Sequence, residues 1–121
     1  MKSYATLNLN GDFRRAYARG KSFADPALVT YALKTRSGVC RMGITVSKKV
    51  GCAVERNRCK RVIRAAFRDC CEEITGGWDL VFVARGRTKY LKSTVIRKIM
   101  RRQLIQVGAI RGKSENVDMG R

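Results

Sequence analysis

The stretch from residue 53 to residue 74 constrains the fold of this 121-residue chain more than any other. Its apolar residues recur every three or four positions, the spacing that gathers side chains on one face of an α-helix. On a helical projection they fill an arc of about 140°. They are Cys59, Val62, Ile63, Ala66, Phe67, Cys70 and Ile74. A helix with so continuous an apolar face must bury it, so the rest of the chain has to supply a core against which it packs.

The same helix carries a second stripe, which is made of cations. Six basic residues fall within thirteen positions that contain no acid: Arg56, Arg58, Lys60, Arg61, Arg64 and Arg68. All except Arg58 project within roughly 140° beside the apolar arc, with Asn57 among them. Like charges four residues apart repel by a few tenths of a kcal/mol per pair, so a solvated face normally mixes both signs. The stripe therefore predicts contact with phosphate groups, which Arg binds in a bidentate manner.

The overall charge points to the same class of partner. The chain has 27 Lys and Arg against 9 Asp and Glu, a formal net charge of +18 at pH 7. Such self-repulsion favours a polyanion, and nucleic acid is the first candidate, ahead of acidic substrates and anionic membrane surfaces. The chain has no His, which excludes a Ser-His-Asp triad, His-based acid–base catalysis and a His metal site.

Composition also indicates the compartment. The longest plainly apolar run covers residues 80–84, far short of the ~20 residues of a transmembrane helix, and the N-terminus has no hydrophobic signal core. Five cysteines without Cys-x-x-Cys spacing favour reduced thiols that pack as small hydrophobes. They are Cys40, Cys52, Cys59, Cys70 and Cys71. These features predict a cytoplasmic protein that has no membrane partner.

The periodicities along the chain predict an α+β fold of a single domain over residues 1–110, followed by a flexible polar tail at 111–121. Asn10 and Ser93 are expected to cap the first and last helices, and Gly20 and Gly108 to follow their ends. The expected elements are a helix at 11–19, strands at 27–34 and 39–47, the long helix at 53–74, a strand at 79–85 and a helix at 93–107. This α-β-β-α-β-α order predicts a two-layer α/β sandwich with a small mixed sheet.

Two motifs in fixed register resemble the signature of the protein subunit of bacterial ribonuclease P. The first is Ser47-Lys48-Lys49-Val50-Gly51, and the second, which begins eight residues later, is Glu55-Arg56-Asn57-Arg58-Cys59-Lys60-Arg61-Val62-Ile63-Arg64. The resemblance covers about residues 7–107 and includes Asp12-Phe13, Met42-Gly43-Ile44-Thr45-Val46 and Asp79-Leu80-Val81-Phe82-Val83-Ala84-Arg85. Tyr17, where Phe is common, and Cys52, where Asn is frequent, depart from the pattern.

The resemblance implies a function and a set of binding residues. The family protein assists an RNA subunit that removes the 5′ leader from precursor tRNA with Mg²⁺, so no side chain is expected to be catalytic and no residue is assigned as a metal ligand. It also implies a βαβ crossover of the rare left hand, and no required protein partner. The implied RNA-subunit contacts are Lys48, Lys49, Arg56, Asn57, Arg58, Lys60, Arg61, Arg64 and Arg68. The implied contacts to the single-stranded leader are the aromatic residues Phe13, Tyr17 and Tyr31.

Three other functions fit part of the pattern. Another small RNA-binding protein of related fold, such as a ribosomal protein, would share the charge and the helix stripe. A metal-dependent nuclease needs acidic ligands that converge, whereas the nine acids here are scattered along the chain. A DNA-binding protein agrees with the charge alone, because no helix-turn-helix pair is visible.

Overall fold

A computed structural model of the chain describes residues 4–111. Its elements, in chain order, are β1 (Ala5–Thr6), α1 (Asn10–Arg19), β2 (Lys21–Asp25), β3 (Leu28–Thr35), β4 (Cys40–Thr45), the 3₁₀ turn η1 (Lys48–Val50), α2 (Ala53–Cys70), η2 (Cys71–Glu73), β5 (Gly77–Ala84), η3 (Thr88–Tyr90) and α3 (Ser93–Val107). None of these helices is long and apolar enough to span a membrane. Apart from Arg111, the tail at 111–121 lies outside the described residues, so its flexibility and the domain boundary stay predictions.

The five strands form one sheet in the order β1-β4-β5-β3-β2. β4 and β5 are parallel neighbours joined through α2, and β3 pairs with β5 in the antiparallel sense. β5 is thus the central strand, and seven of its eight residues are buried. The predicted strand at 79–85 is therefore confirmed, and its continuous apolar run is typical of a strand buried on both faces.

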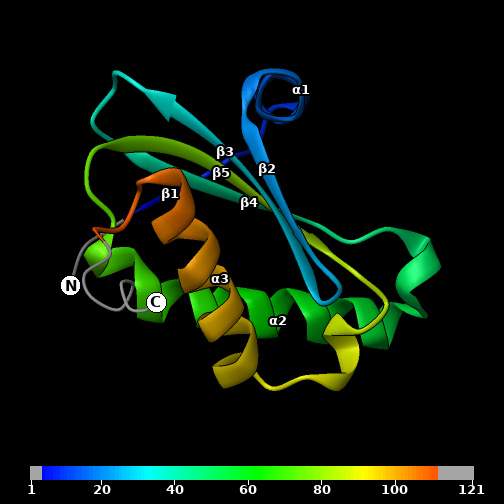
Figure 1. Cartoon of the computed structure of the whole chain (residues 1–121). Coiled ribbons are helices and arrows are strands. Elements are labelled where there is room, and N and C mark those ends of the chain that lie inside the picture. The colour runs from blue at the N-terminus through cyan, green and yellow to red at the C-terminus, as the bar shows by residue number, and fades with distance from the viewer. Residues whose placement is uncertain (1–3, 112–121) are drawn as a thin grey trace.

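Helices cover both faces of this sheet (Figure 1). α2 and α3 pack on one face, where Phe67 of α2 and Leu104 of α3 join Phe82 of β5 in the main core. α1 lies on the opposite face, where Ala16 packs against Val81. Every residue of the apolar stripe predicted for the long helix is buried.

The α+β class with a mixed sheet is confirmed. The sheet and the layer of α2 and α3 form the predicted sandwich, and α1 adds cover to part of the other face. The β4–α2–β5 unit is the predicted parallel crossover. Its left hand remains a prediction from the resemblance.

The predicted element order lacks two strands that the structure contains. β2 pairs with β3 at the edge of the sheet, and its side chains are exposed or half-buried. β1 pairs with β4 through only two residues. Neither strand shows the alternation of apolar and polar residues on which a sequence-based strand prediction depends, because an edge strand needs little burial. The order is therefore β-α-β-β-β-α-β-α.

The predicted helix caps are also corrected. Asn10 and Ser93 lie inside their helices, because the carbonyls of Leu9 and Lys92 already accept the first helical hydrogen bonds. α2 ends at Cys70, four residues earlier than predicted, and η2 continues the chain. The end of α3 is confirmed, since Gly108 has the left-handed backbone (φ 93°) that favours glycine at this position.

The cysteines agree with the reduced state, with one exception to their packing role. None of the five forms a disulfide, and four of them are buried. Cys52, at the start of α2, is exposed, so the prediction that it packs as a small hydrophobe is wrong. Its position before the first turn of the helix, rather than on the apolar stripe, explains the difference.

Candidate nucleic-acid interface

A buried charge network holds α1 on the sheet. The Arg41 guanidinium donates to both carboxylate oxygens of Asp79, over 2.9 and 2.7 Å, and to Asp12 over 3.3 Å. Asp79 is 1% exposed and Asp12 is 8% exposed, so both carboxylates need charge compensation; Arg41 supplies it to both, and Arg15 also pairs with Asp12 over 3.2 Å. Hydrogen bonding to Asp79 raises the pKa of Arg41 above its ordinary value. The network joins α1, β4 and β5, and no periodic pattern along the chain predicts it.

An open groove of about 630 Å³ runs between α1, the end of β4 and α2. Its lining residues are Asn10, Phe13, Arg14, Tyr17, Ile44, Thr45, Val46 and Lys60. The Tyr17 hydroxyl lies 2.8 Å from the Thr45 hydroxyl, and the Tyr17 side chain is 38% exposed. The groove therefore combines two aromatic rings with polar groups and three basic or amide side chains, the components that bind single-stranded nucleic acid.

The Phe13 ring reaches the sheet because residue 43 has no side chain. A Cβ atom at Gly43 would lie 2.5 Å from the ring carbon Cζ of Phe13. Real Cβ atoms do not approach other atoms so closely, so the glycine creates the space in which the ring lies. This residue belongs to the motif quoted above, but its role depends on a helix thirty residues away.

Of the three aromatic residues assigned to the leader, the structure brings two into the groove. Phe13 and Tyr17 line it, whereas Tyr31 of β3 is not among the lining residues. The ring of Tyr31 instead packs edge-on against Tyr17, with ring centroids 4.9 Å apart. Tyr31 thus supports the ring of Tyr17.

The cationic residues of α2 begin at the edge of this groove. Lys60 lines it, and Lys60 also lines a smaller hollow of about 160 Å³ together with Arg56 and Asn57. Arg56 is half-buried, and its Nε atom is buried without a hydrogen-bond partner among the described residues. Arg64 and Arg68, further along α2, are exposed. The predicted basic stripe is therefore present, and one end of it meets the groove.

Arg58 and Arg61 lie on another side of α2, next to the start of α3. They line a groove of about 390 Å³ that the two helices share. The Arg58 guanidinium donates to the carbonyl of Lys89 over 2.9 Å and to that of Leu91 over 3.4 Å. Arg58 thus links η3 to α2, so it has a structural role in addition to the predicted RNA contact.

The turn before α2 completes the basic surface. Lys48 and Lys49 of η1 are both exposed. Behind them, Glu55 accepts a hydrogen bond from the Cys52 backbone over 3.0 Å and lies 3.4 Å from the Lys89 ammonium group. The hydrogen bond from Cys52 and the charge of Lys89 hold the pKa of Glu55 below its usual value.

A second stretch rich in Lys and Arg, residues 85–102, differs from the basic stripe of α2 in how its cations are paired. Arg101 forms a bidentate pair with Glu73, and the hydrogen bond from Arg101 lowers the pKa of that carboxyl group. Arg97 and Arg102 lie 4.0 and 3.9 Å from acidic partners on other elements. These three cations are paired with carboxylates, whereas Arg64 and Arg68 have no acidic partner within residues 4–111, so α2 is the better candidate for binding phosphate.

Acidic side chains do not gather in this surface. Within residues 4–111, no group of three or more His, Cys, Asp or Glu could hold a metal ion. The groove beside α1 has no carboxylate in its lining. Its residues do not fit Mg²⁺, which prefers carboxylate and phosphate oxygens. The arrangement is suited to binding a polyanion with unpaired bases.

Comparisons with known proteins identify relatives over most of the chain. The family model for ribonuclease P matches residues 1–108. The ribonuclease P protein component of Clostridioides difficile (strain 630) is 50% identical over 84 residues, which cover 69% of this chain and 74% of that protein. The component of Alkaliphilus oremlandii is 36% identical over 110 residues, which cover 87% and 96% of the two chains.

Solved structures show the same fold. The RNase P protein of Staphylococcus aureus superimposes with a TM-score of 0.77 at 33% identity, covering 90% of this chain and 99% of that one. The RNase P protein of Thermotoga maritima gives a TM-score of 0.74 at 28% identity, covering 87% and 97%.

Proposed function

Because this chain belongs to the ribonuclease P protein family, we propose that it binds the RNA subunit of ribonuclease P through α2 and the 5′ leader of precursor tRNA through the groove beside α1. The family membership makes it the protein component of a ribonucleoprotein endoribonuclease. It also decides against a ribosomal protein, a metal-dependent nuclease and a DNA-binding protein as the family of this chain.

The observation that carries the proposal is the position of Lys60. This side chain belongs both to the basic surface of α2 and to the lining of the aromatic groove. An RNA subunit on α2 and a leader in the groove would therefore lie next to each other at Lys60, and neither lining places a carboxylate between them. Aromatic stacking accepts any base, which suits a leader whose sequence differs between precursors.

The proposed RNA-subunit surface consists of basic and amide side chains from η1 and α2. Its members are Lys48, Lys49, Arg56, Asn57, Arg58, Lys60, Arg61, Arg64 and Arg68. The proposed leader site consists of Phe13 and Tyr17, with Tyr31 acting through its contact with Tyr17. The hydrolysis and its Mg²⁺ belong to the RNA in this proposal, since the groove offers no carboxylate to a metal ion. The cytoplasm is the expected compartment, and no further protein is required.

Reconstitution tests this function. Precursor tRNA is incubated at low Mg²⁺ concentration with the protein alone, with a bacterial ribonuclease P RNA alone, with both, and with neither. We expect efficient cleavage to a 5′-phosphorylated mature end only when both are present. Cleavage by the protein alone would show catalytic residues that the proposal lacks, and RNA binding without any gain in cleavage would reduce the role to general RNA binding.

The leader site is tested by Tyr17→Ala in the reconstituted enzyme. Loss of one stacked base is worth about 1–3 kcal/mol, so the Kd for precursor tRNA should rise about 5- to 100-fold. Tyr17→Phe retains the ring and should bind nearly as the parent does. Affinity for mature tRNA, which has no leader, should not change. Equal losses for both RNAs would refute the leader assignment.

A further inference from the structure

The turn η3 presents an aromatic ring that neither the core nor the leader groove uses. Tyr90 is 76% exposed, more than any other large hydrophobic side chain in residues 4–111. A tyrosine ring exposed in this way offers a partner a large flat apolar face together with a polar hydroxyl group. Tyr90 is the last residue of η3, which lies beside the N-terminal end of α2, because Lys89 of η3 is 3.4 Å from Glu55 in the first turn of that helix.

The turn that carries this ring is firmly attached to the fold. Thr88 is completely buried, and its hydroxyl donates to the Ala27 carbonyl over 2.6 Å. The Lys89 ammonium group donates to the Val50 carbonyl over 2.8 Å, and Arg58 donates to the Lys89 carbonyl. Hydrogen bonds to Ala27 just before β3, to η1 and to α2 therefore hold the turn in place. The exposure of Tyr90 is built into the structure and is not the result of a loose loop.

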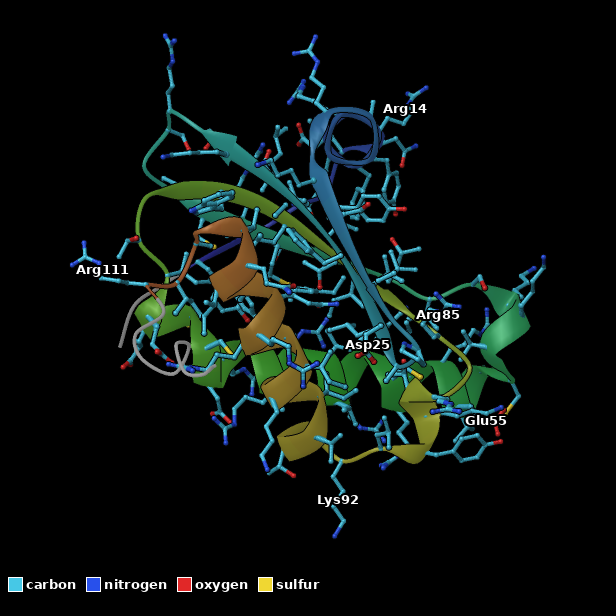
Figure 2. All side chains as sticks on the ribbon, in the orientation of Figure 1. Arg14, Asp25, Glu55, Arg85, Lys92 and Arg111 are labelled. Carbon is cyan, nitrogen blue, oxygen red and sulfur yellow. The ribbon has the colours of Figure 1, made fainter. Side chains whose placement is uncertain are left out.

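One cation lies against the ring, and others line the neighbouring groove. The Lys89 nitrogen lies 5.3 Å from the centre of the Tyr90 ring, a cation–π distance. Two residues further on, Lys92 contributes to the groove between α2 and the start of α3, together with Arg58 and Arg61. Figure 2 shows Lys92 pointing away from the fold and Glu55 at the neighbouring end of α2. The groove lining contains three cations and no carboxylate.

We propose that Tyr90 stacks on an unpaired base of the RNA subunit, and that the adjacent backbone phosphates enter the groove between α2 and α3. This inference rests on the proposed function and extends it to a contact surface separate from the leader groove. A ring with Lys89 beneath it accepts the face of a base, and Arg58, Arg61 and Lys92 supply positive charge for the phosphates on either side. An apolar peptide would offer no negative charge to these three cations.

The RNA subunit is the preferred partner because of where the turn is attached. Arg58, which the proposed function places on the RNA-subunit surface, holds η3 directly through two carbonyls. A base stacked on Tyr90 would therefore lie next to the same surface that binds the RNA subunit. The leader groove lies elsewhere, and its lining includes no residue of η3 or α3.

Binding of ribonuclease P RNA to protein variants tests the inference. We expect Tyr90→Ala to raise the Kd for the RNA subunit about 5- to 100-fold, the effect of one lost stacking contact. Tyr90→Phe and Tyr90→Trp keep a stacking face and should bind like the parent. Because Tyr90 is uncharged, the salt dependence of binding should stay the same in Tyr90→Ala, whereas Lys92→Ala should reduce its slope by about one.

The control is Val39→Ala, which removes a similarly exposed apolar side chain (47%) from the turn between β3 and β4. It should not change the Kd, and all variants should melt at nearly the same temperature. Parental affinity of Tyr90→Ala would overturn the inference, and so would an equal loss in Tyr90→Phe. A loss seen only for precursor tRNA binding to the assembled enzyme would also overturn it, because the contact would then belong to the substrate.

One further variant separates this inference from the function on which it rests. The double variant Arg64→Ala and Arg68→Ala removes two exposed cations of α2 far from η3. If it weakens RNA binding while Tyr90→Ala does not, only the Tyr90 inference fails. If neither weakens binding, α2 is not the docking surface and the proposed function fails with it.

Discussion

At the scale of single residues, surroundings decide what each cysteine can do. Burial raises the pKa of Cys70 to about 11, because the thiolate would lose its hydration inside the core. Burial likewise raises the pKa of Cys59. Both thiols stay protonated at neutral pH and pack as small apolar groups. Cys52 alone is exposed, so its chemistry differs from that of residues with the same side chain.

A thiol reagent should distinguish these environments. We expect the native protein to react rapidly with Ellman's reagent at one thiol, and the unfolded protein at all five. Cys52→Ser should abolish the rapid phase, because the remaining four thiols are buried. Cys70→Ser is the matched comparison and should leave the rapid phase intact. A rapid phase that persists in Cys52→Ser would mean that one of the buried cysteines becomes exposed on the time scale of the reaction.

At the scale of elements, the position of α1 depends on two contacts with β4. Arg41 bridges Asp12 of α1 and Asp79 of β5, and Gly43 leaves the space that the Phe13 ring occupies. Arg41 and Gly43 both lie on the face of β4 against which α1 packs. The geometry of the proposed leader site is therefore set as much by the strand as by the helix that provides its aromatic residues.

Adding one methyl group to β4 should disturb this site. In Gly43→Ala the new Cβ would clash with Phe13, so the free energy of unfolding should fall by about 1–3 kcal/mol. Affinity for leader-bearing precursor should fall as well, while affinity for the RNA subunit should remain, because α2 packs on the other face. Urea unfolding and binding titrations measure these effects.

Gly11→Ala in α1 is the matched control for this change. Nothing lies within 4 Å of a Cβ at that position, and alanine favours the helix by up to about 1 kcal/mol. It should therefore be neutral or stabilising. A Gly43→Ala protein as stable as the parent would mean that Phe13 can leave its place on the strand without cost.

At the scale of the whole molecule, the charge is large but unevenly compensated. Three arginines of α3 have acidic partners, namely Arg97, Arg101 and Arg102. The exposed cations in the second half of α2 belong instead to residues 56–68, which contain no acid. The net charge of +18 draws any polyanion to the protein. The distribution of ion pairs over the surface, and not the total charge, decides which face of the protein binds the polyanion.

The salt dependence of RNA binding should reveal this selection. Between about 50 and 200 mM salt the affinity should fall steeply, and each cation that contacts a phosphate contributes about one unit to the slope. Arg64→Ala should therefore reduce the slope by about one. Arg102→Ala, an exposed arginine 3.9 Å from Asp25, should leave it nearly unchanged. Equal reductions by both variants would show that the general field binds the RNA, with no preferred face.

Features that depend on neighbours within a helical turn or along a strand can be predicted from the amino-acid sequence. The spacing of Cys59 to Cys70 predicts the buried face of α2, and the apolar run at 80–84 lies within the strand predicted at 79–85; both are confirmed. The ordered motifs around Arg56 indicated the family, which the comparisons confirm. Such signals can be read locally, because the side chains that share a helix face are only three or four residues apart.

Contacts between segments that are distant in the chain become visible in the three-dimensional fold alone. The bridge from Arg41 to Asp79 joins residues 38 positions apart, and Arg58 reaches the Lys89 carbonyl across 31 positions. β2 forms at the edge of the sheet because it pairs with β3. The sequence of β2 shows little alternation of apolar and polar residues. The exposure of Tyr90 follows from a turn attached to three other elements. Strand register and helix docking create these contacts, and no local period in the sequence encodes them.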